Sequence, residues 1–163
     1  MSHFCGGHTS GRGEEMDTVS DGNLLARVLL TLATIGYGVI TVKADFNRTH
    51  ATNPLWTPHA RFHVVWQITS YAGFGLIALA LIWLPGPYRV ERLYLAAAFA
   101  AVVYGAFFVA LATMSVYGGR TYDENGYQPF RLNIAGPRLM DLNVTVFTVQ
   151  LVVLLAGAAL IGR

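Results

Sequence analysis

The chain has 163 residues, of which 54% are hydrophobic and only 12% are charged. Soluble domains carry about 25% charged residues, so this composition excludes an ordinary water-soluble fold and is typical of an integral membrane protein. The formal net charge of +2 is too small to indicate a nucleic-acid partner, and the sequence contains no basic run.

The first 23 residues are polar and rich in glycine, serine and charge. They lack the apolar core of a secretory signal. We therefore expect residues 1–23 to form a disordered tail, followed by one transmembrane domain over residues 24–163. The tail holds the single cysteine, Cys5, between His3 and His8, and one thiol on such an arm does not make a metal framework.

Four apolar runs follow the tail. About 20 apolar residues cross the ~30 Å hydrocarbon core as a helix, and each run reaches this length. In lipid the backbone N–H groups must be paired within their own segment, which favours helices over strands. The sequence therefore predicts an all-α fold, an integral membrane four-helix bundle. Its spans are expected at about residues 24–43, 59–84, 92–117 and 138–161.

The links between the spans are unequal. Two of the links are long, at residues 43–61 and 117–141. Loops of more than ~12–15 residues without structure of their own are uncommon, and they are usually functional or disordered. Two crossings separate them, so both are expected on the same side of the bilayer. Lysine and arginine are divided almost evenly between the two sides. We expect a protein of the bacterial plasma membrane with cytoplasmic termini.

The second span begins with a group of polar residues. Thr57 can cap this helix and Pro58 suits its first turn. His59 and His63 are four residues apart and share one face, and Gln67 continues the row. Unpaired polar groups facing hydrocarbon cost several kcal/mol each, so the row is expected to face the bundle interior.

The fourth span carries the expected partner of these histidines. Gly136 and Pro137 indicate a helix start, which places Asp141 about one turn inside the helix, where the helix dipole favours a carboxylate. Asp141 is then close in depth to His59 and His63. We predict these three as the catalytic residues.

The pattern D-x-N-x-T-H-x-x-N-P-x-W-x-P-H-A-x-F-H runs over residues 45–63. It resembles the signature of an uncharacterised family of small four-span membrane proteins found in bacteria and fungi. The resemblance implies four helices and a shared polar site, and it supplies no reaction. In size and layout the chain is also similar to the membrane sterol isomerases, in architecture alone.

Three kinds of chemistry fit the polar residues. Histidines at i and i+4 can chelate a divalent metal such as zinc or iron, with predicted ligands His50, His59, His63 and Asp45. Alternatively, histidine with a carboxylate can transfer protons on a lipid-like or terpenoid substrate between aromatic walls. The residues expected to bind that substrate are Asn47, Asn53, Trp56, Gln67 and Arg138. The third reading is a non-catalytic binding or accessory subunit, with membrane lipids and other membrane subunits as partners.

Overall fold

A computed structural model describes the backbone of residues 11–132 and 138–163, and the side chains of residues 23–131 and 139–163. Its elements in chain order are α1 (Gly11–Ile35), the π-helical η1 (Gly36–Ile40), α2 (Thr41–Asp45), α3 (Pro58–Trp83), α4 (Arg89–Ala112), α5 (Met114–Tyr117), β1 (Phe130–Leu132), β2 (Arg138–Met140) and α6 (Leu142–Ala159).

Within the described residues, four helices are long and apolar enough to cross a membrane. The first of them, Asn23–Asp45, runs through the end of α1, η1 and α2 without interruption, and the other three are α3, α4 and α6. This arrangement is compatible with an integral membrane protein, and the predicted all-α four-helix fold is confirmed.

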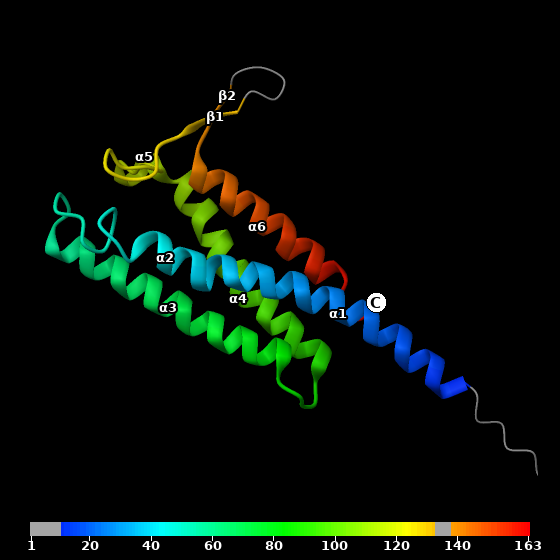
Figure 1. Cartoon of the computed structure of the whole chain (residues 1–163). Helices are drawn as coiled ribbons and strands as arrows, with labels where there is room; N and C mark the ends of the chain where they lie inside the picture. Colours follow the sequence, from blue (N-terminus) through cyan, green and yellow to red (C-terminus); the bar gives the residue numbers. More distant parts are fainter. Residues whose placement is uncertain (1–10, 133–137) are drawn as a thin grey trace, which may run out of the picture.

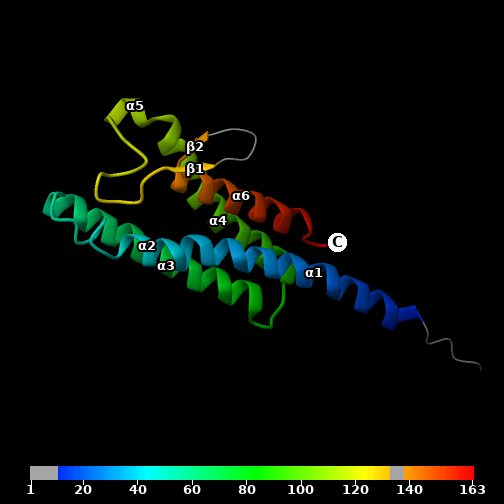
Figure 2. The ribbon, with the colours of Figure 1, turned by 45° about the horizontal axis from the view of Figure 1, so that its top comes forward.

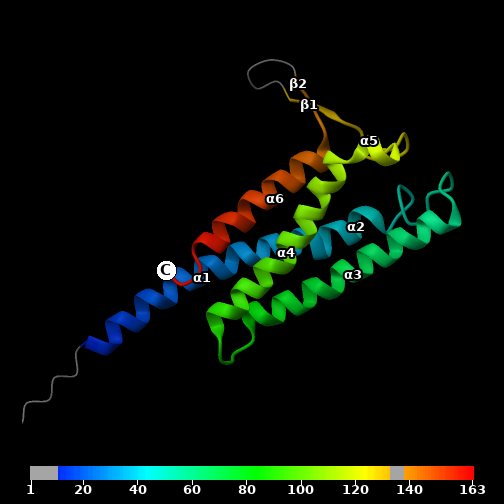
Figure 3. The ribbon, with the colours of Figure 1, turned by 180° about the vertical axis from the view of Figure 1, so that it is seen from behind.

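The four helices form a closed ring. The α1 helix lies between α6 and α3, and its most extensive contacts are with α6 (Figures 1 and 2). The α3–α4 hairpin brings α4 across the other side of the bundle, where it also contacts α6 (Figure 3). Both long links lie together at one end of this ring, opposite the α3–α4 turn (Figure 1).

Small residues let the helices approach closely. A Cβ added to Gly38 would lie only 3.3 Å from the Cα of Gly75, so η1 and α3 are in backbone contact there. Tyr104 of α4 is buried and donates its hydroxyl to Ala33 O at 2.5 Å. These contacts fix η1 against α3 and the end of α1 against α4 within the core.

Several element boundaries differ from the predicted spans. The α1 helix begins at Gly11, upstream of the expected start of the first span at about residue 24, and residues 1–10 lie outside the described part. The α4 helix ends at Ala112 because Thr113 leaves the helical conformation (φ −106°), and α5 follows separately.

The start of the fourth span is also different. The sequence placed Asp141 one turn inside the helix, but Asp141 is the N-cap of α6 and accepts from Val144 N at 3.0 Å. The residues before it form β2, which pairs antiparallel with β1. Gly136 and Pro137, on which the prediction rested, lie outside the described residues. In contrast, Thr57 caps α3 and Pro58 occupies its first turn, as predicted.

Candidate functional site

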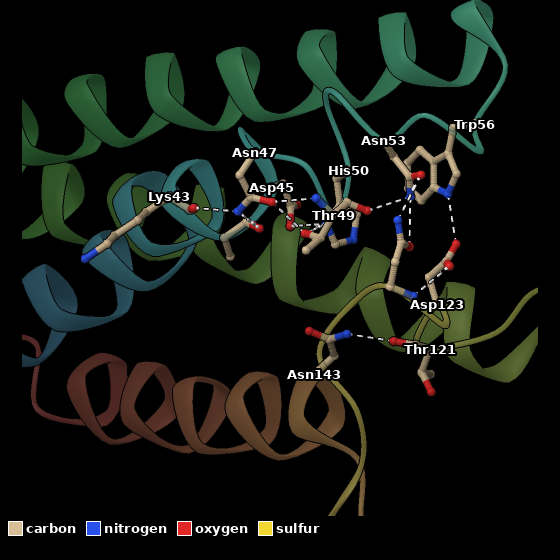
Figure 4. A network of polar contacts seen from close by, with 12 residues as sticks. Lys43, Asp45, Asn47, Thr49, His50, Asn53, Trp56, Thr121, Asp123 and Asn143 are labelled. Carbon is tan, nitrogen blue, oxygen red and sulfur yellow. Dashed lines mark hydrogen bonds and ion pairs between the residues drawn. The ribbon is translucent and has the colours of Figure 1, made fainter.

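The link after α2 is folded by the side chain of Asn47. Its Nδ2 donates to Lys43 O at 3.2 Å and to Ala44 O at 2.8 Å, so it satisfies carbonyls that the helix end leaves free. Its Oδ1 accepts from both the backbone N and the hydroxyl of Thr49, at 2.8 and 2.7 Å (Figure 4). Asn47 therefore sets the direction in which the chain leaves the membrane helix.

The two long links are joined by a reciprocal pair of amides. Asn53 Nδ2 donates to Asn125 Oδ1 at 3.2 Å, and Asn125 Nδ2 donates to Asn53 Oδ1 at 3.1 Å. Asn53 is 0% exposed and also bonds Thr49 O and Leu55 N within its own link (Figure 4). A single buried side chain thus holds residues 72 positions apart in contact.

A second bond between the links joins an indole to a carboxylate. Trp56 Nε1 donates to Asp123 Oδ2 at 2.9 Å. This hydrogen bond, together with backbone N–H groups such as that of Asn125, holds the pKa of Asp123 below its usual range. The second link is in turn tied to α6, where Asn143 Nδ2 donates to Thr121 O at 2.7 Å and Thr121 bonds the Asp141 carboxylate.

One histidine of the link pairs with a carboxylate at the membrane end. His50 Nδ1 lies 3.6 Å from Asp45 Oδ1 and 2.7 Å from the Thr49 hydroxyl. The side chains of His50 and Asp45 are only 25% and 24% exposed. The His50 ring also meets the Trp56 ring edge-on, with centroids 5.2 Å apart. His50 is therefore held on several sides in one orientation.

The His50–Asp45 pair borders a cavity inside the bundle, here called the chamber. The chamber has a volume of about 380 Å³, within the range of small-molecule sites. Its walls come from η1, α2, α3, α4 and α6, with Tyr127 of the second link. The aromatic lining residues are Tyr71, Tyr104, Phe107, Tyr127 and Phe147, and the polar ones are Thr41, Asp45, His50, Gln67, Asn143 and Gln150.

Gln150 contributes a hydrogen-bond acceptor that has no donor among the described residues. Its Oε1 is buried and has no hydrogen-bond partner among the described residues, although Gln150 lines the chamber. Buried polar atoms are nearly always paired, and an exception at a cavity indicates a group that a ligand or water would satisfy. The chamber therefore combines an apolar wall, an acid–base pair and a free acceptor.

A second cavity lies on the other side of His50, among the links. It has a volume of about 570 Å³ and is lined by His50, Leu55, Trp56, Gly118, Arg120, Thr121, Tyr122, Asp123 and Glu124. His50 therefore lines both the space formed by the polar links and the chamber between the helices.

Residues 29–147 match the model of a family of unknown function, DUF6640. The chain belongs to this family. Comparisons with curated proteins and with solved structures gave no match. The matched range includes the whole pattern at residues 45–63 and every residue that lines the chamber except Gln150. The predicted membership of an uncharacterised family is thus confirmed, while its signature stays a prediction.

In this DUF6640 protein, the two histidines of the predicted row do not face the bundle interior. His59, His63 and Gln67 are all exposed, but Gln67 also lines the chamber. The two histidines contact each other, with Nε2 atoms 3.0 Å apart, and His63 stacks on Trp66. The expected inward orientation is wrong for the histidines, because helical spacing aligns residues on one face without specifying which part of that face packs.

Asp141 is not joined to these histidines. Among the described residues its carboxylate bonds Thr121 and Val144 N, and no hydrogen bond or ion pair links it to His59 or His63. The predicted metal ligands are also divided, into a His59–His63 pair and a His50–Asp45 pair. In the described part of the chain, no three His, Cys, Asp or Glu residues group as metal ligands.

The residues expected to bind substrate have mixed positions. Asn47, Asn53 and Trp56 build the links, and only Gln67 of the set lines the chamber. The side chain of Arg138 lies outside the described residues. Sequence reasoning missed Gln150 and Asn143 in α6 and Asn125 in the second link. Polar residues in an apolar run would have indicated the first two, whereas Asn125 carries no local signal.

Proposed function

We propose that this protein is a small membrane enzyme that binds a lipid-like or terpenoid molecule in the chamber and transfers a proton on it. The observation that carries this proposal is the His50–Asp45 pair, 3.6 Å apart, at the border of an apolar cavity between membrane-compatible helices. Imidazole gives and takes protons near neutral pH, and a neighbouring carboxylate stabilises its charged form.

The chamber favours a mainly hydrocarbon ligand with one polar group. Its walls are largely aromatic and aliphatic, which suits rings or isoprene units. The unpaired Gln150 Oε1 would accept a hydrogen bond from a ligand hydroxyl, and the hydroxyl would otherwise be costly to bury. A hydroxylated terpenoid or sterol-like molecule satisfies both features.

The chemistry is a shift of a double bond. A proton first adds to one carbon of the double bond, His50 then removes a proton from the carbon on the other side of the resulting cation, and the electron pair of that C–H bond forms the new double bond. Asp45 stabilises the imidazolium in the interval. No electrons enter or leave the substrate, so only a proton donor and acceptor are required.

Ligand binding is tested by filling the chamber. Val146 of α6 lines it, while Val149 on the same helix is 55% exposed. We expect the Val146→Phe variant, purified in mild detergent, to lose the terpenoid or sterol-like molecules that mass spectrometry finds in extracts of the wild-type protein. The Val149→Phe control should retain them. Equal retention by both variants would contradict the proposal.

A second candidate is an accessory subunit of a membrane complex. It is favoured by the exposed His59 and His63, which lie beside the exposed Phe62 and Trp66 on the outer face of α3. Polar rings on an outer helix face gain from a covering partner. Crosslinking from position 62 in native membranes would test this reading, because a subunit interface predicts a discrete protein adduct and lipid exposure predicts none.

A further inference from the structure

Three arginines gather at the end of the bundle opposite the chamber. Arg27 of α1 and Arg89 and Arg92 of the first turn of α4 line a cavity of about 230 Å³. The remaining walls are the end of α3 and the α3–α4 turn, from Leu81 to Gly86. The arginines of α1 and α4 and the last turn of α3 thus surround one small space at the end of the membrane spans.

Two of the arginines are fixed by the last turn of α3. Arg27 Nε donates to Ile82 O at 3.0 Å, and its guanidinium lies 4.2 Å from the centre of the Trp83 ring. Arg92 Nη2 donates to Ala80 O at 3.0 Å. A guanidinium has five N–H donors, so each retains donors for a further acceptor.

No described carboxylate balances the charge of this cluster. Among the described residues, no carboxylate lies within ion-pair distance of Arg27, Arg89 or Arg92, and the His50–Asp45 pair is at the other end of the bundle. Glu91, on the same turn of α4, does not line the cavity. Like charges held together in this way are stabilised by a bound anion.

The start of α4 adds to the attraction for an anion. Its N-cap, Tyr88, is in the left-handed conformation (φ 58°) and makes no side-chain capping bond. The N–H groups of the first turn therefore have no side-chain acceptor, and the positive end of the helix dipole lies beside the arginines.

We propose that this cavity binds the phosphate group of an anionic phospholipid. Arginine matches phosphate with paired hydrogen bonds, and basic pockets between transmembrane helices recognise anionic headgroups. The position at the end of the spans brings the site to headgroup level. The site is independent of the chamber. Because the cytoplasmic leaflet carries anionic lipid, the site favours a cytoplasmic position for the end of the bundle that holds the α3–α4 turn.

The test compares lipid binding to single-arginine variants. Arg89 is exposed and makes no hydrogen bond among the described residues, so Arg89→Gln should fold normally. Arg120→Gln is the matched control, because Arg120 is also exposed and lines a cavity, at the opposite end. Phosphatidylglycerol, phosphatidylcholine and inorganic phosphate are titrated separately onto detergent-solubilised full-length protein, with native mass spectrometry and thermal unfolding as readouts.

We expect phosphatidylglycerol to bind and stabilise the wild-type protein more than phosphatidylcholine, and Arg89→Gln to bind it about fivefold more weakly. Arg120→Gln should match the wild type. If inorganic phosphate stabilises the protein equally well and Arg89→Gln removes the effect, the phosphate site is supported with a soluble ligand as its source. Equal binding of both lipids, or equal weakening in both variants, would overturn the site.

Discussion

Three histidines lie within 14 residues of the sequence and belong to two pairs, His59–His63 and His50–Asp45. The surroundings of the two pairs differ. His59 and His63 contact each other on the exposed face of α3. His50 is three-quarters buried, pairs with Asp45 and borders the chamber. Only the second pair combines a carboxylate, restricted orientation and access to a cavity between the helices, which are features that proton transfer requires.

The difference arises from how each pair is positioned. Helical spacing alone brings His59 and His63 together, and both rings stay exposed among the described residues. His50 is oriented by the turn that Asn47 forms and by the Thr49 hydroxyl, and that turn is held by contacts from the second link. A side chain held by two distant segments has a better-defined position than one held by its own helix.

The largest expected effect is on proton transfer itself. In D2O, the wild-type protein should incorporate deuterium into the carbon skeleton of its bound ligand. Replacing His50 by Gln removes the base and should slow incorporation by about 10²–10⁴-fold, the usual contribution of general acid–base catalysis. Mass spectrometry of the extracted ligand measures the rate, with His63→Gln as the matched control. Equal rates in both variants would exclude His50 as the base.

A smaller but global effect is expected from Asn53. The Asn53→Ala variant leaves the buried partners of this amide without hydrogen bonds, at a cost of about 2–3 kcal/mol in the free energy of unfolding. Thr52→Ala, at an exposed position in the same link, should change stability by less than about 0.5 kcal/mol. Denaturant unfolding in detergent measures both.

The partner residue sharpens this test. If the reciprocal amide pair is the source of the stability, Asn125→Ala should cost less in the Asn53→Ala background than in the wild type. Additive losses would show that the two links are held together by other contacts.

Much of the fold could be predicted from composition because lipid imposes strict requirements. Apolar length predicted the four helices, and the capping chemistry of Thr57 and Pro58 predicted the start of α3 to within about one residue. The start of the fourth helix is harder to predict, because Gly136 and Pro137 indicate a start although Asp141 is the N-cap. An Asp before an apolar run satisfies the N-cap rule equally well, and the choice between the two starts depends on the β1–β2 pairing.

The site was predicted only in part, for a reason of geometry. The density of polar residues indicates a polar site at residues 45–63, and His50 and Asp45 are among the predicted metal ligands. The chamber, however, is formed by helices distant in sequence, and its remaining polar groups, Asn143 and Gln150, come from α6. No local pattern specifies which helix faces meet, so the sequence could not show that His50 reaches this cavity while His63 does not.

We expect the exposed His59–His63 pair to bind added metal ions and the His50–Asp45 pair not to contribute to this binding. With Nε2 atoms 3.0 Å apart at i and i+4, His59 and His63 can together bind Cu²⁺ or Ni²⁺. Trp66 stacks on His63, so binding should quench its fluorescence. His59→Gln should remove the quenching, Trp66→Phe should remove the signal, and His50→Gln should leave both unchanged. Quenching that survives the loss of His59 would place the metal elsewhere.

The smallest expected effect concerns acid stability of the links that position His50. The Trp56 indole lowers the pKa of Asp123, so this carboxylate stabilises the fold above its unfolded pKa of about 3.9, and the contribution is lost as the pH falls through the lowered folded pKa. In Trp56→Phe the indole donor is absent. The wild type should therefore have the higher Tm at pH 7, and its advantage should narrow below about pH 4. Thermal unfolding between pH 7 and pH 3, with Trp66→Phe as the aromatic control, measures this. A Tm difference that stays constant over the range would mean that Trp56 stabilises the links by packing against His50 rather than through Asp123.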